Sequence, residues 1–389
     1  MASCLILCLN SGSSSLKFAL YRIGDGQELL LAQGEAELND KQVTRLWIRT
    51  AREKVEKTGA EISAGSTPLR ALAVELKRLQ LPHPDAFGHR LVHGGPDHGA
   101  PERITDKFFN ELGSLILFAP LHLPDEIAGI EAITSNFPSL PQVACFDTAF
   151  HRSMPEVAQR FALPRALGDE GIRRYGFHGI SYEYIMRTLG TSTPARLIIA
   201  HLGNGASMAA VKDGNPLDTT MGFTPAGGFM MGTRSGDLDP GIILYLLNQK
   251  HFDTHKLAEL VNHQSGLLGV SGISDMKMLL ERRGTAPDAA LAVQMFCYQL
   301  RKQIGAFTAV LGGLDLLVFT GGIGERAAPV RWETCIGLEH LGIKLDCKRN
   351  EANADTISAD NSQCFVRVIP TDEDLMIARH TYELIFCSL

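Results

Sequence analysis

A pattern of strand, polar turn and strand occurs twice in this chain, half a chain apart, and it limits the folds open to the sequence. The first copy runs from Leu5 to Ala19 and the second from Leu197 to Val211, with Ser15 aligned on Ser207. Each turn is flanked by apolar strands, which is more typical of a hairpin than of a strand-to-helix loop. The repeat indicates a duplicated domain in which each half offers backbone amides at a turn.

Length and charge agree with a two-domain globular protein. A chain of 389 residues exceeds one ordinary hydrophobic core, so we expect two domains. Hydrophobic residues make up 45% and charged residues 21%, which are ordinary values for a globular chain. The formal net charge of −6 argues against nucleic acid or an anionic membrane as a partner, although a local basic pocket remains compatible with it.

The N-terminus and the cysteines predict a cytoplasmic protein. The apolar run from Cys4 to Leu9 lacks a basic flank and is interrupted at Asn10, so we expect neither a signal peptide nor a membrane span. The eight cysteines form no CxxC pair, which favours reduced thiols over a zinc site or a disulfide framework.

Alternating helix and strand signals predict an α/β protein. We expect strands at 5–9, 18–23, 85–92 and 314–320, and helices at 69–79, from Asp239-Pro240 onward, at 288–311 and at 375–385. The long helix stops at Gly312-Gly313, and the strand that follows delivers Gly321 to Glu325 at its carboxyl end, where open sheets bind ligands.

Three turns rich in small residues follow apolar strands, at 10–15, 203–205 and 321–324. Glycine and serine allow phosphate oxygens to approach the backbone closely, so together these turns indicate a nucleotide site, although no Walker loop is present. Lys17 alternates with Leu16 and Phe18, which places its ammonium group beside the first turn, either at a phosphate or simply in solvent.

Basic residues in glycine- and proline-flanked segments predict an anionic ligand. Arg90, His122, His178 and Arg234 would together form a positive pocket in an acidic protein. Asp147 ends an apolar strand, where a buried carboxylate needs a cation or a metal. Glu373 lies in the first turn of the last helix, where the helix dipole alone would favour an acid, and a metal role is the alternative.

These motifs resemble those of the acetate kinase family. Asn10-Ser-Gly-Ser-Ser-Ser-Leu-Lys17, Gly176-Phe-His-Gly-Ile-Ser-Tyr182 and Met231-Gly-Thr-Arg-Ser-Gly-Asp237 match three of its landmarks in order, over about Leu5 to Arg379. The resemblance implies two ribonuclease-H-like domains of duplicated topology with an active-site cleft between them, residues 1–150 plus 375–389 and residues 151–374. It also implies a homodimer.

The resemblance further implies ATP and ADP as co-substrates, acetate and acetyl phosphate as substrate and product, and Mg²⁺, with Mn²⁺ as an alternative ion. The implied catalytic residues are Asp147, His178, Arg234, Arg90 and His122, and the implied metal-supporting residues are Asn10 and Glu373. The implied phosphate and nucleotide residues are Ser13, Ser15, Lys17, His201, Leu202, Gly203, Asn204, Gly205, Asp275, Met276, Lys277, Gly322, Ile323, Gly324, Glu325 and Arg326. Arg90, Val92, Leu121, Phe177 and Pro225 would hold the acid.

The expected chemistry needs no strong general base, because a carboxylate acceptor is already ionised at neutral pH. Asp147 is therefore better suited to orient a magnesium-bound water or Arg234 than to abstract a proton. Lys277 and Arg326 depart from the residues common in the family, so the preference for the nucleotide base is open. A propionate or other short-chain acid kinase is the alternative function, and a chaperone-type ATPase is a rival from another class.

Overall fold

The computed structural model describes residues 3–12, 15–39, 42–62 and 67–387. The chain divides into two compact units, and each has its own sheet. Unit 1 is Met1–Phe150 with Asp372–Leu389, and unit 2 is His151–Thr371. In the described part of the chain, no helix is both long and apolar enough to cross a bilayer.

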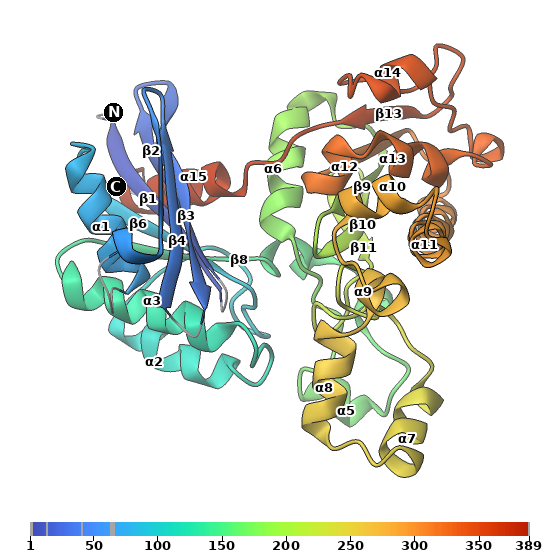
Figure 1. Cartoon of the computed structure of the whole chain (residues 1–389), viewed down its shortest axis with the longest axis horizontal. Coiled ribbons are helices and arrows are strands. Elements are labelled where there is room, and N and C mark those ends of the chain that lie inside the picture. Colours follow the sequence, from blue (N-terminus) through green and yellow to red (C-terminus); the bar gives the residue numbers. More distant parts are fainter. Residues whose placement is uncertain (1–2, 13–14, 40–41, 63–66, 388–389) are drawn as a thin grey trace. The chain divides into compact units, whose positions relative to one another are not determined.

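The sheet of unit 1 has the strand order β5-β4-β3-β2-β1-β6-β8-β7 (Figure 1). The strands are β1 (Cys4–Ser11), β2 (Ser15–Gly24), β3 (Gln27–Asn39), β4 (Gln42–Thr50), β5 (Lys54–Thr58), β6 (Ala86–Leu91), β7 (Glu102–Arg103) and β8 (Gln142–Phe146). Strands β1, β6 and β8 run parallel to one another, and β1 to β5 form an antiparallel meander. The helices are α1 (Pro68–Arg78), α2 (Asp106–Leu115), α3 (Leu123–Asn136) and α15 (Glu373–Phe386).

Alternation along the strands covers both faces of this sheet. Leu7 and Phe87 point into a buried cluster that also holds Leu72 of α1 and Ile133 of α3. The next residue on β6, Gly88, faces α15, because a Cβ there would collide with Ile377. The sheet is therefore packed between α1 and α3 on one face and α15 on the other, and its parallel strands are buried.

The sheet of unit 2 has the order β11-β10-β9-β12-β13, and its strands are β9 (Arg196–Leu202), β10 (Ala206–Lys212), β11 (Asn215–Thr219), β12 (Leu316–Thr320) and β13 (Phe365–Val368). The helices are α4 (Glu156–Gln159), α5 (Arg165–Asp169), α6 (Gly179–Leu189), α7 (Pro240–Gln249), α8 (Thr254–His263), α9 (Gly266–Ser271), α10 (Met276–Arg282), α11 (Pro287–Leu311), α12 (Gly321–Arg326), α13 (Ala328–Cys335) and α14 (Cys347–Glu351). Helix α11 packs on β9 and β10, and α6 packs on β9.

The two sheets share one topology. The order β3-β2-β1-β6-β8 in unit 1 matches β11-β10-β9-β12-β13 in unit 2, with an antiparallel hairpin followed by parallel strands in both. The last paired residues are Ser11 and Leu16 in the first hairpin and Leu202 and Ala206 in the second, so the second turn is shorter. The duplication predicted from the repeated hairpin is confirmed.

The predicted helices and strands are confirmed in type, but one predicted turn is a helix in the structure. Residues Gly321 to Arg326 form α12 rather than an open glycine turn. Gly321 has a φ of 75°, and its N–H donates to Glu325 Oε1 at 3.1 Å, so the Glu325 side chain closes the first turn of the helix. The third small-residue segment is thus a helix N-terminus that follows β12 directly.

Candidate functional site

The parallel strands of unit 1 bring three predicted residues together at their carboxyl ends. Asn10 lies near the end of β1, Arg90 near the end of β6, and Asp147 directly after β8. The Arg90 guanidinium group donates from Nη1 to Asn10 Oδ1 at 3.2 Å and from Nε to Asp147 Oδ1 at 3.2 Å, and its Nη2 pairs with Asp147 Oδ2. Three neighbouring strands therefore fix one arginine at their carboxyl ends, which is where open α/β sheets bind ligands.

Neighbouring carboxylates hold this arginine ionised although it is largely buried. Asp147 is 1% exposed, and the Arg90 side chain is 19% exposed, so the pair is largely shielded from solvent. Burial alone would lower the pKa of Arg90, but the carboxylates of Asp147, Glu373 and Glu126 raise it above its ordinary value. The buried Asp147 carboxylate has the cation that the sequence required, and that cation is Arg90.

Glu126 is a residue of this cluster that sequence reasoning missed. It lies in the first turn of α3, is 2% exposed, and accepts a hydrogen bond from the Val92 N–H at 3.0 Å. Burial raises the pKa of Glu126 to about 8, against the lowering effect of Arg90. An acid in a first helical turn is usually explained by the helix dipole, and its burial against β6 is visible only in three dimensions.

The start of α15 places further carboxyl groups beside the first hairpin. Glu373 is the first residue of α15, and burial raises its pKa while Arg90 and Lys17 oppose that shift. The exposed Lys17 thus lies near these acids, on the strand that follows the first turn. Among the described residues no group of three His, Cys, Asp or Glu side chains could hold a metal ion. The Asn10 amide oxygen, which accepts from Arg90, and the Glu373 carboxylate are oxygen ligands of the kind that Mg²⁺ prefers together with waters and substrate phosphates.

In unit 2, His178 is held in a strained and well-supported position. It precedes α6 with φ 58° and ψ 23°, in the left-handed region that a non-glycine residue rarely adopts. Its Nδ1 lies 2.8 Å from Ser207 Oγ, which in turn contacts the Tyr182 hydroxyl at 2.5 Å. Its ring stacks on His201, with centroids 4.2 Å apart. Sequence reasoning gave no role to Ser207 or Tyr182, although both lie in segments that it singled out.

The side chains of His178 and Arg234 both lie close to Gly205, in the turn after β9. A Cβ added at Gly205 would lie 3.4 Å from His178 Nε2 and 3.4 Å from Arg234 Nη1. Arg234 also donates from Nη1 to the Pro225 carbonyl at 3.1 Å. The absence of a side chain at Gly205 therefore leaves an imidazole and a guanidinium group beside this turn, which is a suitable arrangement for an anion.

A pocket of about 960 Å³ in unit 2 is lined by eight of the sixteen predicted phosphate and nucleotide residues. Its size is that of a small-molecule site. It is lined by the turn after β9, the start of α10, α12 and the start of α13: Gly203, Asn204, Ser274, Asp275, Met276, Lys277, Leu280, Glu281, Gly322, Ile323, Arg326, Ala327 and Pro329. Segments far apart in the sequence thus form one cavity, with a helix N-terminus on its wall.

Several predicted nucleotide residues support this pocket without lining it. His201 accepts or donates a hydrogen bond with Ser181 Oγ at 2.8 Å, and Glu325 is occupied by the Gly321 and Thr371 N–H groups. Leu202 is fully buried in β9, and Gly324 is buried in α12. Gly205 lies beside the side chains of His178 and Arg234.

The remaining predicted residues are distributed over both units. Ser15 begins β2, His122 precedes α3, and Ser13 lies outside the described residues. For the acid pocket, Val92 and Phe177 are buried, Pro225 is half-buried and Leu121 is 44% exposed. Val92 and Leu121 belong to unit 1, and Phe177 and Pro225 to unit 2.

Known proteins of this architecture match over nearly the full chain. The model of the acetokinase family matches residues 5–379. The acetate kinase of Methylocella silvestris is 45% identical over 99% of this chain and 98% of its own, and that of Rhodopseudomonas palustris is 43% identical over 98% of each. A propionate kinase from Francisella tularensis superposes with a TM-score of 0.89 at 37% identity, covering 98% of this chain and 100% of its own.

The acetate kinase of Porphyromonas gingivalis superposes with a TM-score of 0.86 at 38% identity, again over 98% of this chain and 100% of its own. A family match over this length, together with structural agreement over 98% of the chain, does not depend on any one motif. The chain belongs to the acetokinase family.

Proposed function

We propose that this protein is an acetate kinase, which transfers the γ-phosphate of ATP to acetate and gives acetyl phosphate and ADP, reversibly. Its membership of the acetokinase family and the acetate kinases at 43–45% identity support this activity. The observation in the structure that carries the proposal is the cationic group on Arg90, which Asp147 and Asn10 orient at the ends of three parallel strands.

The reaction needs charge neutralisation more than proton transfer. Acetate is ionised at neutral pH, so the obstacle is to bring one anion against a triphosphate. Arg90 would hold the carboxylate of the acid, while Arg234 and His178 would donate to the oxygens of the transferring phosphoryl group. Positioning and electrostatic stabilisation of this kind are the main means by which enzymes accelerate phosphoryl transfer.

Asp147 acts in this scheme as a positioning residue for Arg90. Both carboxylate oxygens of Asp147 contact the guanidinium group, so neither is available as a base toward an acid that has no proton to lose. A bidentate pair also fixes the plane of the guanidinium group. The remaining nitrogen of the Arg90 guanidinium group, Nη1, donates to Asn10, next to the first turn.

The nucleotide would occupy the 960 Å³ pocket of unit 2. The N-terminus of α12 and the amides of residues 204 and 205 would face phosphate oxygens, and Met276 and Lys277 would border the nucleoside. Lys17 would approach the β- or γ-phosphate from the first hairpin. Mg²⁺, or Mn²⁺ in its place, would be supported by Asn10 and Glu373 and would neutralise phosphate charge when bound.

Acetate is the substrate we assign, and propionate is the alternative, since a structural relative is a propionate kinase. One methylene changes transition-state binding by about 1 to 3 kcal/mol in an apolar pocket. The test is to compare kcat/KM for acetate, propionate and butyrate by ADP release. A higher value for acetate supports the assignment, and a higher value for propionate or butyrate contradicts it.

We also propose a cytoplasmic homodimer. Helix α7 has the sequence PGIILYLLNQ, yet none of its residues is buried, and Leu244 and Tyr245 are 60% and 53% exposed. An apolar helix without a buried face is typical of a surface that another chain covers. The long helix α11, which the sequence left open as an interface or a core helix, is instead rich in buried residues such as Phe296 and Leu300.

A further inference from the structure

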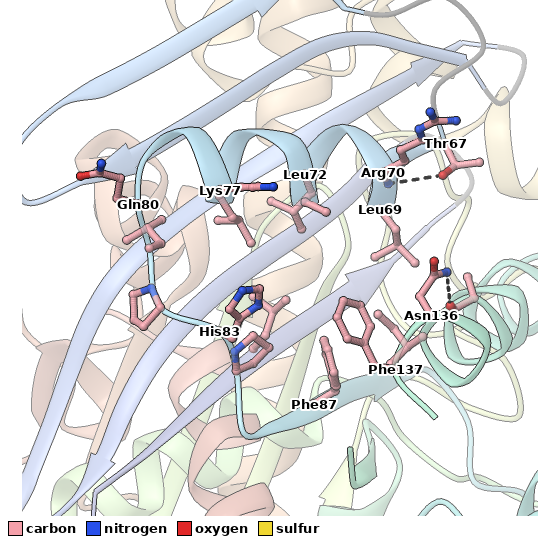
Figure 2. A pocket seen from close by; sticks show the side chains of 18 residues that line it. Thr67, Leu69, Arg70, Leu72, Lys77, Gln80, His83, Phe87, Asn136 and Phe137 are labelled. Carbon is pink, nitrogen blue, oxygen red and sulfur yellow. Dashed lines mark hydrogen bonds between the residues drawn. The ribbon is translucent and has the colours of Figure 1, made fainter. Parts of the chain in front are cut away.

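A second, largely apolar cavity lies in unit 1, apart from the residues assigned to phosphoryl transfer. It measures about 580 Å³ and lies between α1, the loop that follows it, and the end of α3 (Figure 2). Figure 2 shows Leu69 and Leu72 projecting from α1 on the side that faces Phe87 and Phe137. The cavity opens to solvent, since Ala73, Lys77 and His83 are exposed, and its volume falls in the range of ligand sites.

The walls are apolar, and the cationic side chains that line the cavity are Arg70 and Lys77. Leu7, Leu72, Phe87 and Ile133 form a floor in which every side chain is less than 5% exposed. Lys77 and His83 also line the cavity, and none of the described residues that line it is acidic. In the described part of the chain, no ion pair joins Lys77 to a carboxylate. Glu75 of the same helix pairs instead with Lys57 and Arg78, on another face.

We propose that this cavity, which we call the α1 pocket, binds an amphipathic carboxylate, with its apolar body on the Leu72 and Phe87 floor and its carboxylate toward Lys77 and His83. An uncharged apolar ligand would leave the basic rim without a function, and a purely polar anion would leave the apolar floor exposed to water. An acid with a chain longer than that of the substrate satisfies both halves of the site.

The α1 pocket shares its supporting elements with the Arg90 cluster. Leu7 is on β1 with Asn10, Phe87 is on β6 with Arg90, and Ile133 is on α3 with Glu126. The pocket and the cluster thus lie along the same two strands and helix, at residues three apart on each strand. An occupant would contact the strands that position Arg90, without touching the residues assigned to catalysis.

The test uses octanoate as the probe, measured by isothermal titration calorimetry on the full chain with acetate at saturation. We expect one octanoate per chain, and octan-1-ol, which lacks the charge, should bind about fivefold more weakly. Ala73→Trp should abolish binding, because Ala73 lines the pocket at an exposed position where an indole would fill the space without disturbing the core. Lys77→Glu should weaken octanoate about fivefold.

Lys256→Glu is the matched control, since Lys256 is an exposed helical lysine of α8 that is remote in sequence from the pocket. It should leave octanoate binding unchanged. Circular dichroism and kinase activity will show that each variant folds, because none of the changed residues belongs to the catalytic set. Absence of binding, displacement of octanoate by acetate, or equal binding to wild type, Ala73→Trp and Lys77→Glu would overturn the proposal. Equal affinity for octanoate and octan-1-ol would overturn the carboxylate assignment.

Discussion

Asp147 carries the clearest consequence at the scale of single residues. Asp147→Ala removes both contacts of the carboxylate with Arg90 and leaves that cation without its main partner in a largely buried site. We expect kcat to fall about 100-fold at saturating Mg²⁺ and the free energy of unfolding to fall by about 2 to 4 kcal/mol. Enzyme kinetics and thermal unfolding measure the two effects.

Asp169→Ala is the control for this change, because Asp169 forms its ion pairs at the surface, where its side chain is 55% exposed. It should change the free energy of unfolding by less than about 1 kcal/mol. Unaltered phosphoryl transfer in Asp147→Ala would show that Asp147 does not position Arg90 for the reaction.

Glu126 predicts a pH dependence of stability. Its pKa is raised by burial from an ordinary value of 4.5 to about 8, so the unfolded chain releases this proton at lower pH than the folded chain does. Folding stability is therefore lost as pH rises from about 4.5 to about 8. Glu126→Gln should flatten the decline of Tm between about pH 5 and pH 8 and gain a few kcal/mol relative to wild type at the upper end. A decline of Tm in Glu126→Gln as steep as that of the wild type would refute a raised pKa of Glu126.

At the scale of secondary-structure elements, the turn after β9 is the sensitive point of unit 2. In Gly205→Ala the new methyl group would lie 3.4 Å from both His178 Nε2 and Arg234 Nη1, at the near limit of van der Waals contact, so it would crowd both groups. A displacement of donors aimed at a developing charge should lower kcat about tenfold with little change in Tm. Gly284→Ala meets nothing within 4 Å and should retain full activity. Comparable kcat values for the two variants would contradict the proposed role of this point.

The elements were predictable from the sequence where local rules dominate. Asp239-Pro240 begins α7 with the Asp239 carboxylate accepting from the Gly241 N–H, and Gly312 ends α11 in the left-handed region, as capping preferences predict. The alternation of Lys17 with Leu16 and Phe18 is also confirmed by their burial. Periodicity and caps depend on neighbours in sequence, so a single chain contains enough information for them.

The site depended on contacts between distant residues, and there the sequence was less informative. It identified Arg90 and Asp147 separately but not their pairing, which requires β6 and β8 to be adjacent. The sequence did not indicate Glu126, because the burial of this residue comes from packing against β6. It predicted a turn at residues 321–324, because the hydrogen bond from the Gly321 N–H to the Glu325 side chain, which closes the first turn of α12, is not visible in the sequence. The roles assigned to the site residues, including Mg²⁺ binding by Asn10 and Glu373, stay predictions.

At the scale of the whole molecule, the exposed apolar helix α7 predicts self-association. Leu244→Glu places a charge on its 60% exposed position, where a partner chain would have to bury it. We expect the wild type to elute as a dimer and the variant to shift toward monomer in size-exclusion chromatography with light scattering. Val157→Glu changes an isolated apolar residue that is 89% exposed and should leave the oligomeric state unchanged. A monomeric wild type, or a dimeric Leu244→Glu variant, would contradict an interface at α7.

At the same scale, a carboxylate kinase is defined by the acyl phosphate that it forms. The most direct measurement is to incubate the protein with ATP, Mg²⁺ and acetate in the presence of hydroxylamine, which converts an acyl phosphate to a stable hydroxamate. Acetohydroxamate formed in equal amount to ADP is the predicted result, and omission of acetate should remove both products. Release of ADP without hydroxamate, or no product with acetate, propionate or butyrate, would contradict the assignment of this protein as a carboxylate kinase.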